Sequence, residues 1–131
     1  MQRIAVVTDS VAMLPESLAR ELNIRVVPIV LTIGDRSYRD GIDLTTQEFY
    51  RLLRTSEELP TTAAPSVGEF LKVFEEALTD AEAVVAVHVS SELTSVSRIA
   101  LMAAGQIPGG RVHVFDSQSA TMAQGLSLIH I

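Results

Sequence analysis

Short apolar runs alternate along this chain with segments of helical periodicity, and this alternation is the feature that most constrains its fold. Runs rich in β-branched residues lie near residues 4–7, 25–31, 83–89 and 112–115. Polar residues bound each run, as expected of strands that are buried on both faces of a sheet. Strands that alternate with helices are typical of a parallel sheet covered by helices. We therefore expect an α/β fold, with the four runs in one mainly parallel sheet and helices on both of its faces.

Capping signatures mark the starts of two expected helices. Thr45 followed three residues later by Glu48 is a capping box, in which each side chain binds the backbone N–H of the other residue. Ser66 and Glu69 repeat this pattern. The two boxes predict helices that run to about residue 54 and about residue 79. Periodic apolar patterns predict two more helices, over about residues 15–22 and 93–104.

Prolines and polar clusters indicate where the chain turns. Pro28 interrupts the second apolar run, which indicates an edge strand or a bulge. Residues 34–37 are expected to form a turn, and residues 37–41 a polar loop. Pro60 and Pro65 bracket a segment that should be extended, because proline restricts its own backbone and that of the preceding residue.

Composition narrows the class of protein. The 131 residues are enough for one domain with a real core, and we expect a single domain over residues 1–131. The formal net charge of −6 argues against nucleic-acid binding, which requires clustered Lys and Arg. The absence of cysteine excludes a disulfide and a cysteine zinc site. The first apolar run is too short for a signal peptide, and no stretch is long enough for stable membrane insertion, so we expect a cytoplasmic protein.

Polar residues follow three of the expected strands, and ligands of parallel sheets bind where the strands end. Hydroxyl groups and helix N-termini together can hold an anion. The groups that should meet at this edge are Asp9 and Ser10, Ser90 and Ser91, and Asp116 and Ser117, joined by Thr61 and Thr62 before a capped helix. Each of these residues could instead serve only as a helix cap, and the sequence leaves both interpretations open.

Other kinds of site have weaker support. The chain has no glycine-rich phosphate loop and no nucleophile elbow, and its histidines share no metal-ligand spacing, so we expect no cofactor or metal. Asp9 and Asp116 could act as the paired carboxylates of a small metal-dependent hydrolase or phosphotransferase. We favour caps or loop anchors for both residues, because short Asp side chains so often hold such turns.

An ordered set of short segments resembles the DegV family. The matching segments are Thr8-Asp9-Ser10, Val27-Pro28, residues 37–43, residues 48–50, residues 59–62, residues 65–70, residues 89–94 and residues 114–117. Each segment is unspecific by itself, but their order from residue 4 to about residue 125 is specific.

The resemblance implies a bacterial protein that binds a long-chain fatty acid between two domains and is not itself an enzyme. In that family the protein carries the acyl chain for a fatty acid kinase, which makes acyl phosphate for phospholipid synthesis. The implied carboxylate-binding residues are Thr61, Thr62, Ser90 and Ser91, with Thr62 and Ser91 foremost. Asp9, Ser10, Ser95, Asp116 and Ser117 are expected to support the loops of the site.

The chain departs from the family pattern in three places. Ala63 and Ala64 stand where the family has Ser and Gln, and Ser95 and Val96 stand where it has Gly and Thr. The family continues from a helix near Gly125 into a second domain, whereas this sequence ends with an apolar segment over residues 126–131. We therefore expect the amino-terminal domain of a two-domain DegV-like protein. The alternative hypotheses are a small metal-dependent hydrolase or phosphotransferase that uses Asp9 and Asp116, and an interaction fragment without a ligand.

Overall fold

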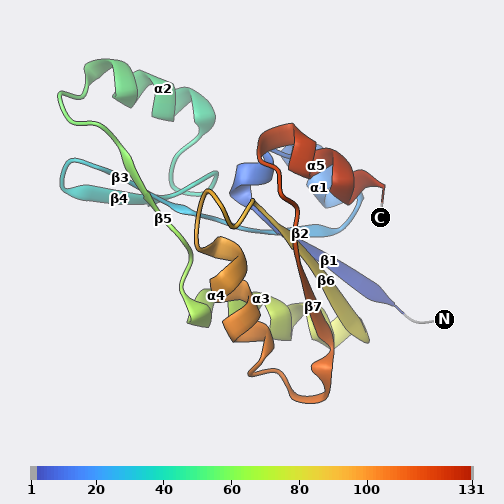
Figure 1. The fold of residues 1–131 in the computed structure, drawn as a ribbon. Helices are drawn as coiled ribbons and strands as arrows, with labels where there is room; N and C mark the ends of the chain where they lie inside the picture. The colour runs from blue at the N-terminus through green and yellow to red at the C-terminus, as the bar shows by residue number, and fades with distance from the viewer. Residues whose placement is uncertain (1–2, 131) are drawn as a thin grey trace.

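The computed structural model describes residues 3–130 and has a four-stranded sheet at its centre (Figure 1). The strands are β1 (Ile4–Asp9), β2 (Ile24–Val27), β6 (Ala83–His88) and β7 (Val112–Asp116). They lie in the order β2-β1-β6-β7, and every neighbouring pair is parallel. The expectation of a mainly parallel α/β sheet is confirmed.

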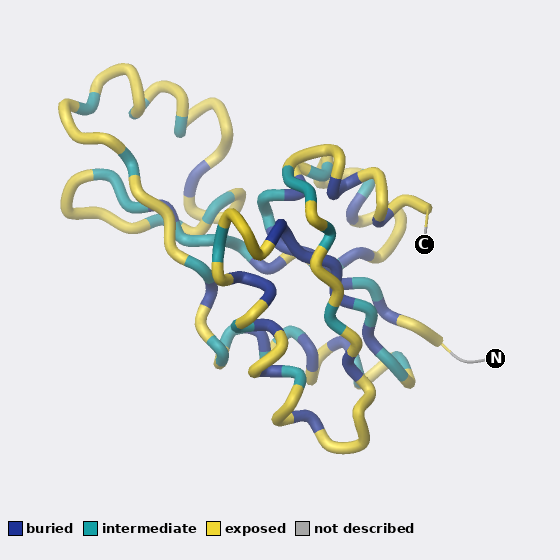
Figure 2. The backbone as a smooth tube through the Cα atoms, in the orientation of Figure 1, coloured by how far each residue is buried: buried dark blue, intermediate teal, exposed yellow. Residues whose placement is uncertain are grey.

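Helices cover both faces of this sheet (Figure 1). On one face lie α3 (Val67–Asp80) and α4 (Val96–Ala104). On the other face lie α1 (Glu16–Glu21) and α5 (Thr121–Ile129). The two faces bury separate apolar clusters, and the central strands between them are the most deeply buried part of the backbone (Figure 2).

The face covered by α3 holds the larger core. Phe70, Phe74 and Ala77 recur at helical spacing and are fully buried against the sheet residues Val7 and Ala86. Burying one such aromatic side chain contributes roughly 1.5–3 kcal/mol. The capping box of Ser66 and Glu69 is present at the start of α3, as expected. The same residues therefore mark where this helix begins and which of its faces packs.

The second apolar run is divided between two sheets. Instead of one strand over residues 25–31, the chain forms β2, breaks at Pro28 and continues as β3 (Val30–Ile33) in a three-stranded antiparallel sheet. The expectation that this run lies within one sheet is wrong. Proline has no backbone N–H to donate to a neighbouring strand, and the run changes partners at that residue.

The second sheet also contains a strand that the sequence did not predict. Residues 37–41 were expected to be a polar loop, but β4 (Arg36–Arg39) pairs antiparallel with β3. Gly34 has a φ of 61°, and it allows a tight turn that brings Arg36 opposite Ile33. The other neighbour of β3 is β5 (Thr61–Ala63), which lies in the segment expected to be extended.

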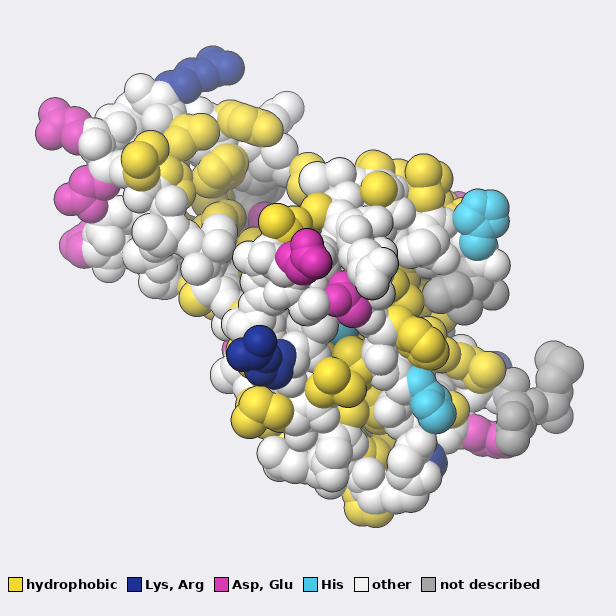
Figure 3. All heavy atoms as spheres, viewed as in Figure 1, with side chains coloured by type: hydrophobic (Ala, Val, Ile, Leu, Met, Phe, Trp, Pro, Cys, Tyr) yellow, Lys and Arg dark blue, Asp and Glu magenta, His cyan; other side chains and the backbone are white. Residues whose placement is uncertain are grey.

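The strands β3 to β5 and helix α2 (Thr46–Thr55) form an arm that projects from the body of the molecule (Figure 1). The expected capping box of Thr45 and Glu48 begins α2. No residue of α2 is buried, so this helix contributes less to the core than α3 does. Hydrophobic side chains lie at the surface of both the arm and the body (Figure 3).

The remaining elements differ in detail from the expected ones. A 3₁₀ turn, η1 (Ser10–Ala12), follows β1, and another, η2 (Pro108–Gly110), precedes β7. Helix α4 begins at Val96, a few residues later than expected, because residues 91–93 form a turn. Most of the apolar segment over residues 126–131 belongs to α5, and residue 131 lies outside the described residues. Within residues 3–130, no helix has the length and apolarity needed to cross a membrane.

Candidate functional site

The ends of three parallel strands bring polar residues to one edge of the main sheet. Asp9 ends β1, His88 ends β6 and Asp116 ends β7. His88 and Asp116 are direct partners across the pairing of β6 with β7. The structure therefore places the two aspartates at the same edge, where ligands of such sheets bind.

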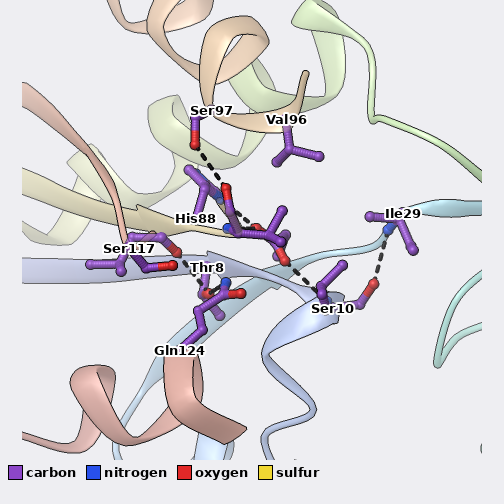
Figure 4. A network of polar contacts seen from close by, with 12 residues as sticks. Thr8, Ser10, Ile29, His88, Val96, Ser97, Ser117 and Gln124 are labelled. Atoms are coloured by element: carbon purple, nitrogen blue, oxygen red, sulfur yellow. Dashed lines mark hydrogen bonds and ion pairs between the residues drawn. The ribbon is translucent and has the colours of Figure 1, made fainter. Parts of the chain in front are cut away.

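A buried polar network lies at this edge, and Figure 4 shows it around His88. Asp9 is its central acceptor. Its carboxylate accepts the backbone N–H groups of Val11 and Val89, each at 3.0 Å. Its Oδ2 also lies 3.0 Å from Nδ1 of His88, and both side chains are fully buried. The His88 ring packs edge-on against Phe70, with ring centroids 5.1 Å apart. Asp9 thus bonds to the backbone of the turns that follow β1 and β6.

Neighbouring hydroxyl groups tie further segments to the same edge (Figure 4). The Ser10 hydroxyl accepts the N–H of Ile29 at 3.0 Å, which links η1 to the segment between β2 and β3. The Thr8 hydroxyl donates to the carbonyl of Val87 and accepts the amide of Gln124 of α5. The sequence did not single out Thr8 or Gln124 as a pair, because 116 residues separate them.

Asp116 is exposed and holds the turn that follows β6. It accepts the backbone N–H of Ser91 at 3.2 Å, the hydroxyl of Ser91, and the N–H of Gln118 at 2.9 Å. The Ser91 hydroxyl, followed by the Gln118 N–H, holds the pKa of the Asp116 carboxyl below its usual value. Asp116 is therefore ionised at neutral pH and is engaged with its own loop.

Two further predicted serines, Ser90 and Ser117, make hydrogen bonds within these loops. The hydroxyl of Ser90, which is largely buried, accepts the N–H of Glu92 at 3.3 Å. The hydroxyl of Ser117 donates to the carbonyl of Ser119 and accepts its N–H, both at 3.2 Å. Both serines shape the turns on which a ligand-binding residue would lie.

A cleft of about 480 Å³ lies between β5 and the start of α4. Its lining is mainly apolar, with three hydroxyl-bearing residues among the ten that contact it: Val11, Ile29, Thr62, Ala63, Ala64, Leu93, Thr94, Ser95, Val96 and Ile99. Of the predicted site residues, Thr62 and Ser95 line the cleft, whereas Thr61, Ser90 and Ser91 are not among its lining residues. All four positions that depart from the family pattern, residues 63, 64, 95 and 96, line it as well.

Within residues 3–130, none of the three hydroxyl groups in the cleft donates a hydrogen bond to the protein, so each can donate to a ligand. Thr94 accepts the N–H of Val96 at 3.1 Å, and this bond leaves the proton of its hydroxyl unused. Ser95 precedes α4, and its side chain does not cap that helix. Both residues lie at the N-terminus of α4, where unpaired N–H groups favour an anion. The sequence missed Thr94 as a site residue, although it stands next to Ser95.

The geometry gives little support to the enzyme with paired carboxylates. Asp9 is fully buried and uses its oxygens for three internal partners, whereas Asp116 is exposed and bonded to Ser91. In the described part of the chain, no group of three or more His, Cys, Asp or Glu side chains is placed to hold a metal ion. His113 and His130 are both exposed.

An open parallel sheet with an apolar, hydroxyl-bearing cleft beside its carboxyl edge defines an α/β domain that is suited to a small amphipathic ligand. The chain belongs to the DegV family, whose model is described as an uncharacterised protein family and matches residues 3–131. The resemblance found in the sequence is thereby confirmed.

Curated relatives and solved structures agree on this family. A DegV domain-containing protein of Caldanaerobacter subterraneus is 36% identical over 129 residues, which are 98% of this chain and 46% of that protein. The crystal structure of DegV from Bacillus subtilis, described as a fatty acid binding protein, is 32% identical with a TM-score of 0.94, over 98% of this chain and 46% of that one. A fatty-acid-binding DegV family protein from Thermus thermophilus is 37% identical with a TM-score of 0.90, over 98% and 45%. The chain thus spans less than half the length of these relatives.

Proposed function

We propose that the protein of which these residues form a domain binds a long-chain fatty acid, with the carboxyl group at the hydroxyls beside α4. The observation that carries this proposal is the cleft between β5 and α4, which combines an apolar lining with Thr62, Thr94 and Ser95. The description of two close structural relatives as fatty acid binding supports it.

Among the residues implied by the family resemblance, Thr62 has the strongest support, because it lines this cleft. Thr61 adjoins it on the same strand, and Ser90 and Ser91 belong to the turn that leads into α4. We propose that these four residues hold or frame the head group. The role of Ser91 differs from that of the other three residues, because its hydroxyl already donates to Asp116.

The energetics assign different roles to the two parts of such a ligand. Each charge-assisted hydrogen bond to the head group contributes roughly 1.5–3 kcal/mol. Each buried methylene contributes about 0.8 kcal/mol, so the acyl chain dominates the affinity of a long fatty acid. The hydroxyls therefore select the head group and fix its position, while apolar surface supplies most of the binding energy.

The bound fatty acid could also be presented to a second protein. A head group held at an open sheet edge is accessible to a second protein, and we propose that a fatty acid kinase phosphorylates the bound carboxyl group to acyl phosphate. The protein then acts in the cytoplasm as a carrier and not as an enzyme. Formation of acyl phosphate by a purified kinase, with and without the carrier, tests this step.

Fatty acid binding itself is tested with the full-length protein. Extraction and mass spectrometry should reveal a co-purified fatty acid, and calorimetric titration with palmitate should give stoichiometric binding. Thr62→Val removes one hydroxyl at nearly constant volume and should weaken binding about tenfold. Thr46→Val, at an exposed position of α2, is the matched control and should leave the affinity unchanged. If the unmodified protein shows no bound fatty acid and no heat of binding, the proposal is refuted.

A further inference from the structure

The single hydroxyl proton of Ser91 is used in a hydrogen bond within the protein. A serine hydroxyl has one proton to donate and two lone pairs that accept. In this structure the Ser91 hydroxyl donates to Oδ2 of Asp116, a residue 25 positions away in the sequence. The Ser91 side chain is exposed, so the hydroxyl offers a ligand only its lone pairs.

Asp116 is held in this arrangement by contacts that do not involve a ligand. Oδ1 accepts the N–H of Gln118 at 2.9 Å, and both carboxylate oxygens lie 3.2 Å from the N–H of Ser91. These bonds lower the pKa of Asp116 and keep it ionised. A fatty acid carboxylate at Ser91 would thus meet two lone pairs and a second negative charge, which is an unfavourable pairing.

We propose that Asp116 is a positioning residue that makes Ser91 a hydrogen-bond acceptor, so that this position takes a head group with a donor, namely the neutral carboxylic acid form of a fatty acid. The O–H of the acid donates to Oγ of Ser91, and its carbonyl oxygen remains available to the hydroxyls of the cleft. This inference rests on the proposed function, and it adds which form of the head group the Ser91 position accepts.

Asp116→Asn inverts this hydrogen bond with little change of shape. With its amide oxygen at the place of Oδ1, asparagine still accepts the N–H groups of Gln118 and Ser91. Its NH₂ group, at the place of Oδ2, donates to Oγ of Ser91, and only the second contact of the Ser91 N–H is lost. The Ser91 proton is then free to donate to a carboxylate. Asp80→Asn removes an equal charge at the end of α3, just before β6 begins and so at the opposite edge of the sheet, and serves as the control.

The test compares palmitate with hexadecanol, which has the same chain length and a neutral head group, by titration of the full-length protein. Asp116→Asn should raise the affinity for palmitate about tenfold and change that for hexadecanol less than about twofold. In a Ser91→Ala background the gain for palmitate should fall below about threefold, because the hydroxyl that is inverted is missing. Asp80→Asn should change neither affinity.

Several outcomes would overturn the proposal. If Asp116→Asn weakens the affinities for palmitate and hexadecanol equally, Asp116 only supports the loop. If Asp116→Asn raises the affinity for palmitate as much in the Ser91→Ala background as in the unmodified protein, the effect comes from the charge of Asp116 alone. If Asp116→Asn does not fold, the Ser91→Ala variant alone tests the inference. Loss of the Ser91 acceptor should weaken the binding of hexadecanol more than that of palmitate. The reverse order would refute the inference. Failure of the unmodified protein to bind either ligand would refute the proposed function, and this inference with it.

Discussion

The carboxylate of Asp9 and the ring of His88 lie 3.0 Å apart at the ends of adjacent strands, with both side chains fully buried. The same carboxylate accepts two backbone N–H groups, one from the turn after each strand. Two loops at the candidate site are therefore held by one side chain, and the stability of the site depends on that of the core beneath it.

Loss of this side chain should be costly. Asp9→Ala leaves the His88 ring nitrogen and the N–H groups of Val11 and Val89 without their partner, and we expect the free energy of unfolding to fall by at least about 3 kcal/mol. Urea denaturation measures the change. Asp80→Asn, at an exposed acid, should stay within about 0.5 kcal/mol of the unmodified protein. A loss below about 1 kcal/mol for Asp9→Ala would show that the network contributes little.

The two capping boxes should differ in their effect on global stability. Ser66→Ala removes the cap of α3, which carries Phe70 and Phe74, and should lower the free energy of unfolding by about 1 kcal/mol. Thr45→Ala removes the same kind of cap from α2, which buries no residue, and should mainly increase local fraying. Urea denaturation with hydrogen exchange separates the two effects. Equal losses of global stability would contradict this difference between the helices.

Two helical glycines should respond to alanine in opposite ways. A Cβ at Gly125 would lie 2.8 Å from the backbone oxygen of Ala12, so Gly125→Ala should force α5 away from η1 and cost about 1–3 kcal/mol. At Gly68 the nearest atom is 3.9 Å away, and alanine there should stabilise α3 by up to about 1 kcal/mol. Thermal unfolding of the two variants gives the sign of each change. Stabilisation by Gly125→Ala would show that the close approach of α5 is easily relaxed.

The pKa of Asp116 should depend on Ser91. The Ser91 hydroxyl is the largest cause of its lowered pKa, so Ser91→Ala should raise that pKa toward the ordinary value of 3.8. Because the folded-state pKa is the lower one, ionised Asp116 stabilises the fold above pH 3.8, and this contribution is lost as the pH falls through the lowered pKa. Carboxyl carbon NMR across this pH range measures the titration.

The control for this titration is Thr45→Ala. The N–H and the hydroxyl of Thr45 lower the pKa of Glu48, so removal of the hydroxyl should raise the pKa of Glu48 and leave that of Asp116 unchanged. If Ser91→Ala leaves the pKa of Asp116 where it was, the hydrogen bond between them does not persist in solution, and the inference on the head group loses its basis.

Structural features that depend only on residues close together in the sequence were predictable from it. Both capping boxes and three of the four β-branched runs, near residues 4–7, 83–89 and 112–115, appear in the structure as expected. Each depends on local backbone geometry or on the burial of one periodic face, so adjacent residues carry the whole signal.

Relationships between distant segments were decided by the tertiary structure alone. Pro28 indicated an interruption, but only long-range pairing determined that the chain leaves one sheet there and enters another. The strand β4 has a polar sequence without a clear alternation, and its pairing with β3 depends on the turn at Gly34. The predicted hydroxyls were separated in the same way: Thr62 lines the cleft, whereas Ser91 is bonded to Asp116. A hydroxyl is recognisable in a sequence, but the partner of its single proton is set by the fold that brings the two residues together.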